Sequence, residues 1–317
     1  MLSYLHQFHA GNHADILKHI VLLYTIEYLN KKEKPYTFFD SHAGRALYDL
    51  KSEEAQKTKE SEKGILKLFS YAQKNPSEVP DELKNYLDFI KYFLEKNQYP
   101  GSPLISLIKK KKDSPLFLTE LHKTEFQKLE ENICNAKNTF NLKNSKVFIE
   151  NSSSWSSLKS KIPPLIKRGC VLIDPSYEEL SDYENAQKTV CEIYKKWNAA
   201  TIILWYPLLS YRIKKITEMN EKITQSVKKI NKNVEILFSE LLVEKEDSHI
   251  ETDLKNLEKD AIPGLYGSGL LIVNPVWNTG NFLEKCLPYI SNALGENSSY
   301  SIKNIKKEIL IPEPYAE

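Results

Sequence analysis

The sequence lacks the short motifs that assign many proteins to a class at once. No C-x-x-C pair occurs, which argues against a zinc site and against a disulfide framework. No G-x-S-x-G elbow occurs, which disfavours an α/β-hydrolase, and no G-x-G-x-x-G occurs, which disfavours a pyrophosphate site. The four cysteines are expected to be buried thiols: Cys134, Cys170, Cys191 and Cys286.

Long apolar runs and a strong net charge are also missing. The early apolar run Ile20–Tyr24 is far shorter than the roughly 20 residues that cross a bilayer. Polar residues interrupt the first twenty positions, so we expect no signal peptide, no membrane association and a cytoplasmic location. The formal charge of +2 does not by itself indicate a nucleic-acid partner. With 317 residues and 41% hydrophobic residues, the chain suits one large α/β domain with an insertion, and we expect a monomer.

Lysines nevertheless occur in runs along the chain. Most runs fall on expected helices, where a solvated surface is the common explanation. The four consecutive lysines Lys109–Lys112 are the best exception, and we expect a basic cleft near them and near Lys18. The other runs are Lys31, Lys32 and Lys34; Lys195 and Lys196; Lys214 and Lys215; Lys228 and Lys229; Lys306 and Lys307.

Apolar periodicity predicts strands that alternate with helices. Asn12 and Asp15 resemble the start of a helix, and the residues that follow have helical spacing. Residues 183–197 and a Lys-rich segment after the strand at 201–205 are also expected to be helical, and the tail after Leu310 to be extended. The expected strands are 36–40, 115–119, 146–150, 170–173, 201–205, 234–242 and, as the last, 269–273.

Alternating strands and helices predict a parallel sheet with helices on its faces. The charged residues 49–98 have a helical pattern and end at strong turn signals, so we expect a helical subdomain inserted at 49–98 into a main domain formed by 1–48 and 99–317. Ligands of such sheets bind at the carboxyl ends of the strands. Asp40, Glu120, the serines after residue 150 and Asp174 are therefore expected along one edge.

The segment Asp174-Pro175-Ser176-Tyr177 after the most apolar strand is the most informative. The exocyclic amine of adenine is a poor nucleophile, because its lone pair is conjugated with the ring. A carboxylate and a neighbouring carbonyl can accept its two hydrogens, and an aromatic ring can stack on a base that has left its helix. Asp174, the Pro175 carbonyl and Tyr177 offer these groups, although an isolated Asp-Pro turn with a surface tyrosine is commoner.

Other candidate residues are less specific. Glu120, at the end of a strand, is the type of group that accepts hydrogen bonds from ribose hydroxyls. His42, in the turn after the first strand, suits either a polar wall of a cofactor site or an ordinary turn. His9, His13 and His19 lack the ligand spacing of known zinc helices, and we expect no metal.

The N-terminus MLSYLHQFHAGNHADILKH resembles the opening of the bacterial RlmJ family, N6-adenine methyltransferases of 23S ribosomal RNA. The resemblance continues, in order along the chain, through the short motifs DSHAG (40–44), YPGSP (99–103), LTELH (118–122), IDPSY (173–177), LWYP (204–207) and SG (268–269). It therefore covers essentially the whole chain, and its first motif is long and specific.

The resemblance implies a class I S-adenosylmethionine-dependent methyltransferase fold, which is Rossmann-like, with a small inserted helical subdomain. It implies Asp174 as the catalytic carboxylate and Tyr4 as an RNA contact. Residues implied to line the cofactor site are Lys18, His19, His42, Ser102, Glu120, Ser153, Ser154 and Asp174.

The chain departs from the family pattern at three places. Arg45-Ala46 stands where the family has a second glycine, Ser153-Ser154 aligns with an Asp-Gly pair, and Ser176 replaces a second proline. The main hypothesis is S-adenosylmethionine-dependent methylation of adenine N6 in 23S ribosomal RNA. The alternative is a nucleic-acid-binding protein with weak or no catalysis, linked to the use of external DNA.

Overall fold

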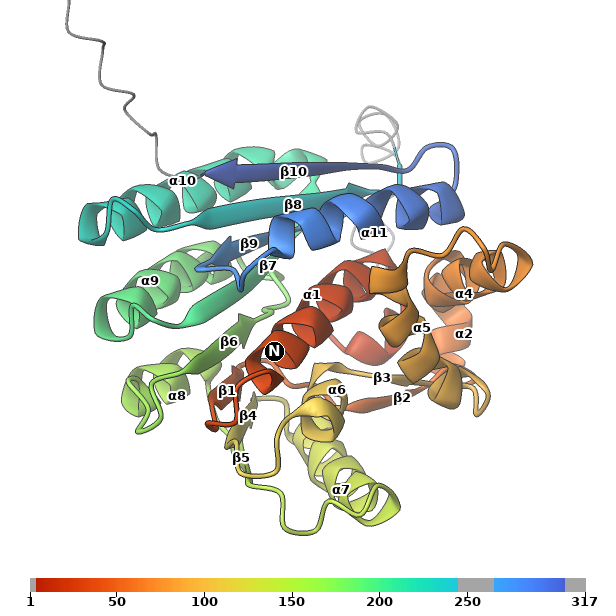
Figure 1. The fold of residues 1–317 in the computed structure, drawn as a ribbon, viewed down its shortest axis with the longest axis horizontal. Helices are drawn as coiled ribbons and strands as arrows, with labels where there is room; N and C mark the ends of the chain where they lie inside the picture. The colour runs from red at the N-terminus through yellow and green to blue at the C-terminus, as the bar shows by residue number, and fades with distance from the viewer. Residues whose placement is uncertain (1–3, 245–264, 306–317) are drawn as a thin grey trace, which may run out of the picture.

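A computed structural model gives the structure of residues 4–244 and 265–305 (Figure 1). Its central feature is an eight-stranded sheet with the order β10-β8-β9-β7-β6-β1-β4-β5. The strands are β1 (Thr37–Asp40), β4 (Leu116–Glu120), β5 (Val147–Asn151), β6 (Gly169–Ile173), β7 (Thr201–Leu209), β8 (Ile236–Leu242), β9 (Leu265–Val273) and β10 (Ser299–Ile305). The predicted alternation of strands and helices is confirmed.

The sheet has a parallel half and an antiparallel half. Strands β5, β4, β1, β6 and β7 pair in parallel, with Phe38 of β1 opposite Leu116 of β4 and Cys170 of β6. Strand β9 is antiparallel to both β7 and β8, and β10 is antiparallel to β8. Strands β1, β4, β5, β6, β7 and β8 therefore all begin at one edge of the sheet, and β9 and β10 end there.

Two layers of helices cover the sheet. Helices α8 (Ser154–Lys161), α9 (Leu180–Lys196) and α10 (Ile213–Ile230) pack successively against one another in one layer. Helix α1 (His13–Asn30) contacts α6 (Ser102–Lys109) and α11 (Thr279–Leu294), and α6 contacts α7 (Lys123–Thr139), in the other layer (Figure 1). The core lies between these layers and the buried strands.

Helix α1 starts where the sequence predicts. The Asn12 side chain accepts a hydrogen bond from the Asp15 backbone N–H at 3.0 Å, which caps the helix. Leu17, Ile20 and Val21 are buried almost completely. Lys18 and His19 are buried as well, so this helix carries polar groups into the interior along with its apolar side chains.

A two-stranded sheet closes the base of the segment predicted as an insertion. Strand β2 (Leu47–Asp49) is antiparallel to β3 (Gln98–Pro100), and between them lie α2 (Glu53–Thr58), α3 (Glu60–Lys63), α4 (Ile65–Lys74) and α5 (Asp81–Leu94). Helices α4 and α5 contact α11. That residues 49–98 form a subdomain of their own stays a prediction.

Several local predictions are wrong. The strand at 269–273 is not the last, because β10 follows α11 and forms the outermost strand of the sheet. Most residues of β10 are exposed, so its sequence resembles that of a polar loop. The turn signals at 99–103 overlap a helix that was not predicted, because Ser102 and Pro103 are the first residues of α6. Cys134 is exposed rather than buried. The tail after Leu310 lies outside the described residues, among which no helix is long and apolar enough to span a membrane.

Candidate active site

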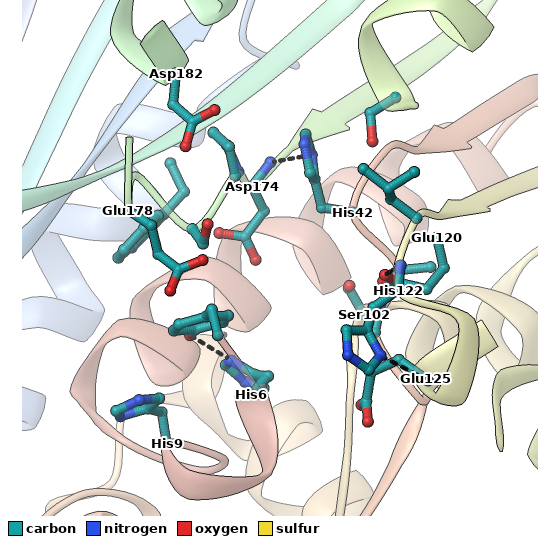
Figure 2. Close-up of a pocket in the computed structure, with 18 of the residues that line it drawn as sticks. His6, His9, His42, Ser102, Glu120, His122, Glu125, Asp174, Glu178 and Asp182 are labelled. Atoms are coloured by element: carbon teal, nitrogen blue, oxygen red, sulfur yellow. Dashed lines mark hydrogen bonds between the residues drawn. The ribbon is translucent and has the colours of Figure 1, made fainter. Parts of the chain in front are cut away.

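A pocket of about 380 Å³ opens at the carboxyl ends of β1, β4 and β6, beside the start of α1 (Figure 2). This volume is within the range of pockets that hold small molecules. The pocket brings together the residues predicted to line a cofactor site: Lys18, His19, His42, Ser102, Glu120, Ser153, Ser154 and Asp174. Tyr4 and Pro175 line it too.

The turn after β1 approaches the pocket closely. Gly44 has a φ of +57°, and an added Cβ would lie 2.3 Å from the Tyr48 hydroxyl. Glycine is therefore required for both the backbone conformation and the space. Ala46 has a φ of 67°, although it carries a side chain. Thus the turn keeps a left-handed backbone at the place where the family has a second glycine.

Arg45 lies outside the pocket lining and holds the turn from behind. Its Nε and Nη2 donate to the two carboxylate oxygens of Glu125, at 2.8 and 2.6 Å, and its Nη1 donates to Gln7 Oε1 at 3.0 Å. The Arg45 and Glu125 side chains are 13% and 5% exposed. Such a bidentate, part-buried pair fixes both partners. Hence Arg45 does not occupy the space that a cofactor needs.

Glu120 faces the pocket with a carboxylate that backbone groups hold in place. Its Oε2 accepts from the Gly44 N–H at 2.8 Å, and its Oε1 accepts from the His122 N–H at 2.7 Å. Burial raises the pKa of Glu120. Each oxygen retains a lone pair, so this carboxylate can accept further hydrogen bonds from hydroxyl groups.

Lys18 joins two carboxylates on the wall of the pocket. Its Nζ lies 2.5 Å from Asp174 Oδ2 and 2.9 Å from Asp15 Oδ1. Burial alone would lower the pKa of Lys18, but the two carboxylates raise it above its usual value. The three groups thus form a buried cluster with a net charge of −1, in which the lysine fixes the position of Asp174.

Asp15 is the central residue of a hydrogen-bond network at the N-terminus. Its Oδ2 lies 2.9 Å from His6 Nε2 and accepts from the Gly11 N–H at 2.8 Å. Burial would raise the pKa of Asp15, but His6 and Lys18 lower it well below its usual range. The sequence indicates Asp15 only as a helix-capping acid, so its place in the pocket was missed. Its spacing of three from Lys18 is the signal that was available.

His19 and His42 are neutral members of the lining. Burial lowers the pKa of each to about 3. His19 Nδ1 lies 2.8 Å from the Tyr99 hydroxyl, and His42 Nδ1 lies 2.8 Å from Ser41 Oγ and 3.4 Å from the Asp174 nitrogen. Figure 2 shows His42 directly beside Asp174. Both rings therefore position backbone and hydroxyl groups without adding charge.

The serines reach the pocket through helix starts. Ser102 is the first residue of α6, and Ser153 precedes Ser154 at the start of α8. The Ser154 hydroxyl donates to the carbonyl of Ser41, which ties α8 to the turn after β1. Backbone N–H groups at helix starts lack partners within the helix, so these positions can hydrogen-bond a ligand.

Asp40 lies at the end of β1 and is 1% exposed. Burial raises its pKa to about 7, and nearby Asp174 adds to the shift, while Ser102 and the backbone of His42 oppose it. A carboxylic acid with this pKa changes charge near neutral pH. Asp40 is not part of the pocket lining and lies behind it.

Tyr177 differs from its predicted position. It is 2% exposed, is absent from the pocket lining, and its hydroxyl donates to the Trp205 carbonyl at 2.9 Å. Its φ of 54° turns the ring beneath the loop, where it packs on Tyr183 and Trp205. In this arrangement the ring cannot stack on a base. The implied stacking role requires the loop to turn the ring outward.

Tyr4 is one of the residues that line the pocket, and its RNA contact stays a prediction. Its ring stacks on His9, with centroids 5.2 Å apart and planes at 7°, and its hydroxyl lies 2.9 Å from His6 Nδ1. His9 in turn lies 2.7 Å from Glu60.

No group of three metal-binding side chains occurs among the residues that the structure describes.

Acidic residues that sequence reasoning missed surround the rest of the mouth. Glu178, Glu179 and Asp182 come from the loop after β6 and the start of α9, and Glu125 comes from α7 (Figure 2). Burial raises the pKa of Asp182. The expectation of a basic cleft near Lys109–Lys112 is wrong. Lys109 ends α6 and the other three lysines lie in the connection to β4, at the end of the strands opposite the pocket.

Comparisons with known proteins agree with this arrangement. Residues 33–305 match the sequence profile of the family described as ribosomal RNA large subunit methyltransferase D, RlmJ. The chain is 33% identical over 297 residues to the ribosomal RNA large subunit methyltransferase J of Escherichia coli (strain K12), with 93% of this chain and 94% of that one covered. The protein of the same name from Haemophilus influenzae is also 33% identical, with the same shares covered.

A crystal structure of a protein from Legionella pneumophila shares the fold. It superposes with a TM-score of 0.74 at 27% identity and covers 95% of this chain and 99% of its own. The sheet, with its pocket at the carboxyl ends of the parallel strands, is the fold of a class I methyltransferase. Within that class, the chain belongs to the RlmJ family. The predicted fold class and family are confirmed.

Proposed function

We propose that this protein transfers a methyl group from S-adenosylmethionine to the N6 nitrogen of an adenine in 23S ribosomal RNA, in the cytoplasm. The relatives carry the name ribosomal RNA large subunit methyltransferase J. The single observation that carries the proposal is the Lys18–Asp174 pair in the pocket that collects the cofactor residues implied by the family.

The residues of the pocket fit S-adenosylmethionine. This cofactor bears a sulfonium and an ammonium group, and carboxylates dominate the lining, with Lys18 as its one Lys or Arg among the described residues. Glu120 offers acceptors for ribose hydroxyls, and its pocket has room for a ligand of this size. When bound, the cofactor supplies an electrophilic methyl group and makes no demand for a phosphate-binding glycine loop.

Asp174 and Pro175 orient the nucleophile. The Asp174 carboxylate and the Pro175 carbonyl accept hydrogen bonds from the two N6 hydrogens and draw the nitrogen toward a tetrahedral geometry. As the N–C bond forms, the bond from the methyl carbon to the sulfonium sulfur breaks, so that S-adenosylhomocysteine leaves with the electron pair. The nitrogen loses one proton, which passes through Asp174 to solvent. Most of the rate enhancement comes from this positioning and from the fixed charges around it.

Lys18 holds the Asp174 carboxylate in place. The ammonium contacts Asp174 at 2.5 Å and is itself anchored by Asp15, so the carboxylate cannot rotate away from the substrate. In the proposal, Tyr4 contacts the RNA at the mouth of the pocket. Tyr177 stacks on the flipped adenine after the loop releases its ring from Trp205.

The test is transfer of radiolabelled methyl from S-adenosylmethionine to protein-free 23S RNA from a strain without this gene. Label should appear as N6-methyladenosine in this RNA and not in wild-type RNA, which is already modified. The variant Asp174→Ala should lose transfer while its affinity for S-adenosylmethionine, measured by calorimetry, changes little. Normal turnover of this variant would contradict the mechanism.

Failure of the wild-type protein has a defined meaning as well. A folded protein that labels neither RNA and binds no S-adenosylmethionine would favour the alternative, a nucleic-acid-binding protein without catalysis. A melting curve for each variant separates loss of chemistry from loss of folding.

A further inference from the structure

Cations gather at the edge of the sheet opposite the pocket. We define the basic edge as the last four residues of α1, α6, α7, α8, α9 and α10, together with the segments that connect them to β1, β4, β5, β6, β7 and β8. Because these six strands run in the same direction, all six connections lie at one edge of the sheet. In Figure 1 the basic edge runs down the left side of the molecule and continues along its bottom.

The charge of the basic edge is far from that of the whole chain. It contains nineteen Lys or Arg and four Asp or Glu, a balance of +15, whereas the chain carries +2. The remainder of the protein, including the pocket, is therefore net negative. Cations at helix ends stabilise the helix dipole, which explains the eight lysines in last turns. Of the eleven in the connecting segments, Lys110, Lys111 and Arg168 donate to backbone carbonyls, and the other eight need another explanation.

Few of these cations are neutralised. Within the described residues, ion pairs engage Lys159 and Lys161 and no other cation of the basic edge. Lys110 is 7% exposed and donates to the Ser114 carbonyl at 2.7 Å. Burial, together with the nearby Lys137 and Lys146, lowers its pKa to about 8, although Asp113 opposes the shift. A surface with so few ion pairs is expected where the anionic partner is another molecule.

An exposed tryptophan lies at the same edge. Trp277 is 70% exposed and follows β9, which ends at the basic edge because it is antiparallel to β7 and β8. The Tyr24 hydroxyl donates to the Trp277 carbonyl at 3.0 Å. Tyr24 is in α1, and Lys31 directly follows the end of this helix, seven residues and about 10 Å further along its axis. Cations beside an exposed aromatic ring are typical of surfaces that bind single-stranded nucleic acid.

Neighbouring contacts join this tryptophan to a second basic segment. Asn274 Nδ2 donates to the carbonyls of Asn198 and Ala200, at 2.7 and 3.0 Å. These residues connect α9, which ends at Lys195 and Lys196, to β7. Trp277 therefore lies between two lysine-bearing segments rather than at an isolated surface position.

We propose that the basic edge binds the phosphate backbone of the ribosomal RNA away from the reacting adenine, and that Trp277 stacks on an unpaired nucleotide there. The proposal rests on the proposed function. The pocket and the basic edge lie at opposite ends of the strands, about 17 Å apart for five residues. An RNA segment that fills the pocket therefore leaves the basic edge to another part of a long RNA.

Two triple variants with the same change in charge test whether RNA binds at the basic edge. The edge variant carries Lys32→Glu, Lys112→Glu and Lys143→Glu, and the control carries Lys63→Glu, Lys74→Glu and Lys222→Glu, all at exposed positions. Filter binding to protein-free 23S RNA across a range of salt gives Kd and the salt slope. For the edge variant, we expect Kd to rise on the order of tenfold and the slope to fall by about 3. Equal losses in both variants, or an unchanged slope, would overturn the proposal.

Methyl transfer to two RNAs separates this proposal from the proposed function. One RNA is the full 23S RNA, and the other is a hairpin trimmed to the methylated adenine and its own stem. The edge variant should lose kcat/KM on 23S RNA and keep it on the hairpin. Equal loss on both RNAs would overturn the proposal. A wild-type protein that methylates neither would contradict the proposed function, while the binding measurement still decides the basic edge.

Trp277 has a readout of its own. The described tryptophans Trp155, Trp197 and Trp205 are less exposed than Trp277, so oligouridylate should quench the emission of Trp277 most strongly. The quenching should largely disappear in Trp277→Phe, which keeps a ring for stacking. Trp277→Ala should bind oligouridylate about tenfold more weakly, and Trp277→Phe nearly as well as wild type. Equal affinities for all three proteins would exclude stacking on Trp277.

Discussion

The pocket and the basic edge stand at opposite ends of the same strands and differ in charge and in burial. The pocket lining holds seven Asp or Glu and one Lys or Arg. The basic edge holds four Asp or Glu and nineteen Lys or Arg. A cationic cofactor and a polyanionic RNA make opposite electrostatic demands. The fold can meet both, because the carboxyl ends of the strands form one surface and the amino ends another.

The same two regions differ in how their residues depend on one another. In the pocket, Lys18, Asp15 and Asp174 are in contact, so the effect of one substitution depends on the other two residues. At the basic edge, Lys32, Lys112 and Lys143 are exposed side chains in separate connections. The effects of substitutions should therefore be large and interdependent in the pocket, and small and additive at the basic edge.

The largest effect is expected for Lys18→Met. It leaves the Asp15 and Asp174 carboxylates buried without their shared cation, which should cost about 3–5 kcal/mol of unfolding free energy. Methyl transfer should be lost as well, because Asp174 is no longer held. Urea unfolding measures the first effect and a transfer assay the second.

A double variant sharpens this result. Lys18→Met with Asp15→Asn removes one of the uncompensated charges and should recover part of the lost stability without recovering activity. A loss below about 1 kcal/mol in the single variant would show that the three groups are not coupled as the distances imply.

The order of strands along the chain predicted that Glu120, Asp174 and the serines after residue 150 lie together. Other lining residues came from the family resemblance alone, namely Lys18, His19, Ser102 and Tyr4. Sequence reasoning failed where one side chain had two uses. Asp15 satisfies the expectation of a capping acid, so nothing in the pattern indicated its contact with Lys18. Tyr177 failed for a different reason, since a single φ of 54° decides whether its ring faces the pocket or the core.

The place of Lys109–Lys112 could have been predicted. These lysines end one helix and enter the next strand, and in a parallel sheet all such connections lie at the amino ends of the strands. The expectation of a basic cleft rested on the charge of these lysines and left out the direction of the strand that follows them. Strand β10 was not recognisable, because residues exposed on both faces carry no apolar alternation.

A second, smaller effect is expected for Asp40→Asn. Burial raises the pKa of Asp40 to about 7 in the folded protein, above the value of about 4 in an unfolded chain. The folded state thus binds this proton more tightly, so the contribution of Asp40 to stability is greatest below about pH 4 and is lost as pH rises through about 7. Asp40→Asn should remove this decline, which is worth at most about 4 kcal/mol.

Melting temperatures of both proteins between about pH 5 and 8 measure the difference. We expect the two proteins to differ least at low pH and the variant to be the more stable at pH 8. Parallel pH profiles would show that Asp40 does not titrate in this range. Cys170→Ser, a neutral substitution at a buried neighbour in β6, serves as the control that should keep the wild-type slope.

The smallest effects are expected for single neutral substitutions at the basic edge. Lys112→Gln and Lys143→Gln remove exposed charges that form no ion pair with the described residues, so each should change the unfolding free energy by less than about 0.5 kcal/mol. Each should lower the salt slope of 23S RNA binding by about 1, and the double variant by about 2. A double variant that falls clearly short of that sum would mean that the two lysines share one phosphate, and the additivity that separates this edge from the pocket would be lost.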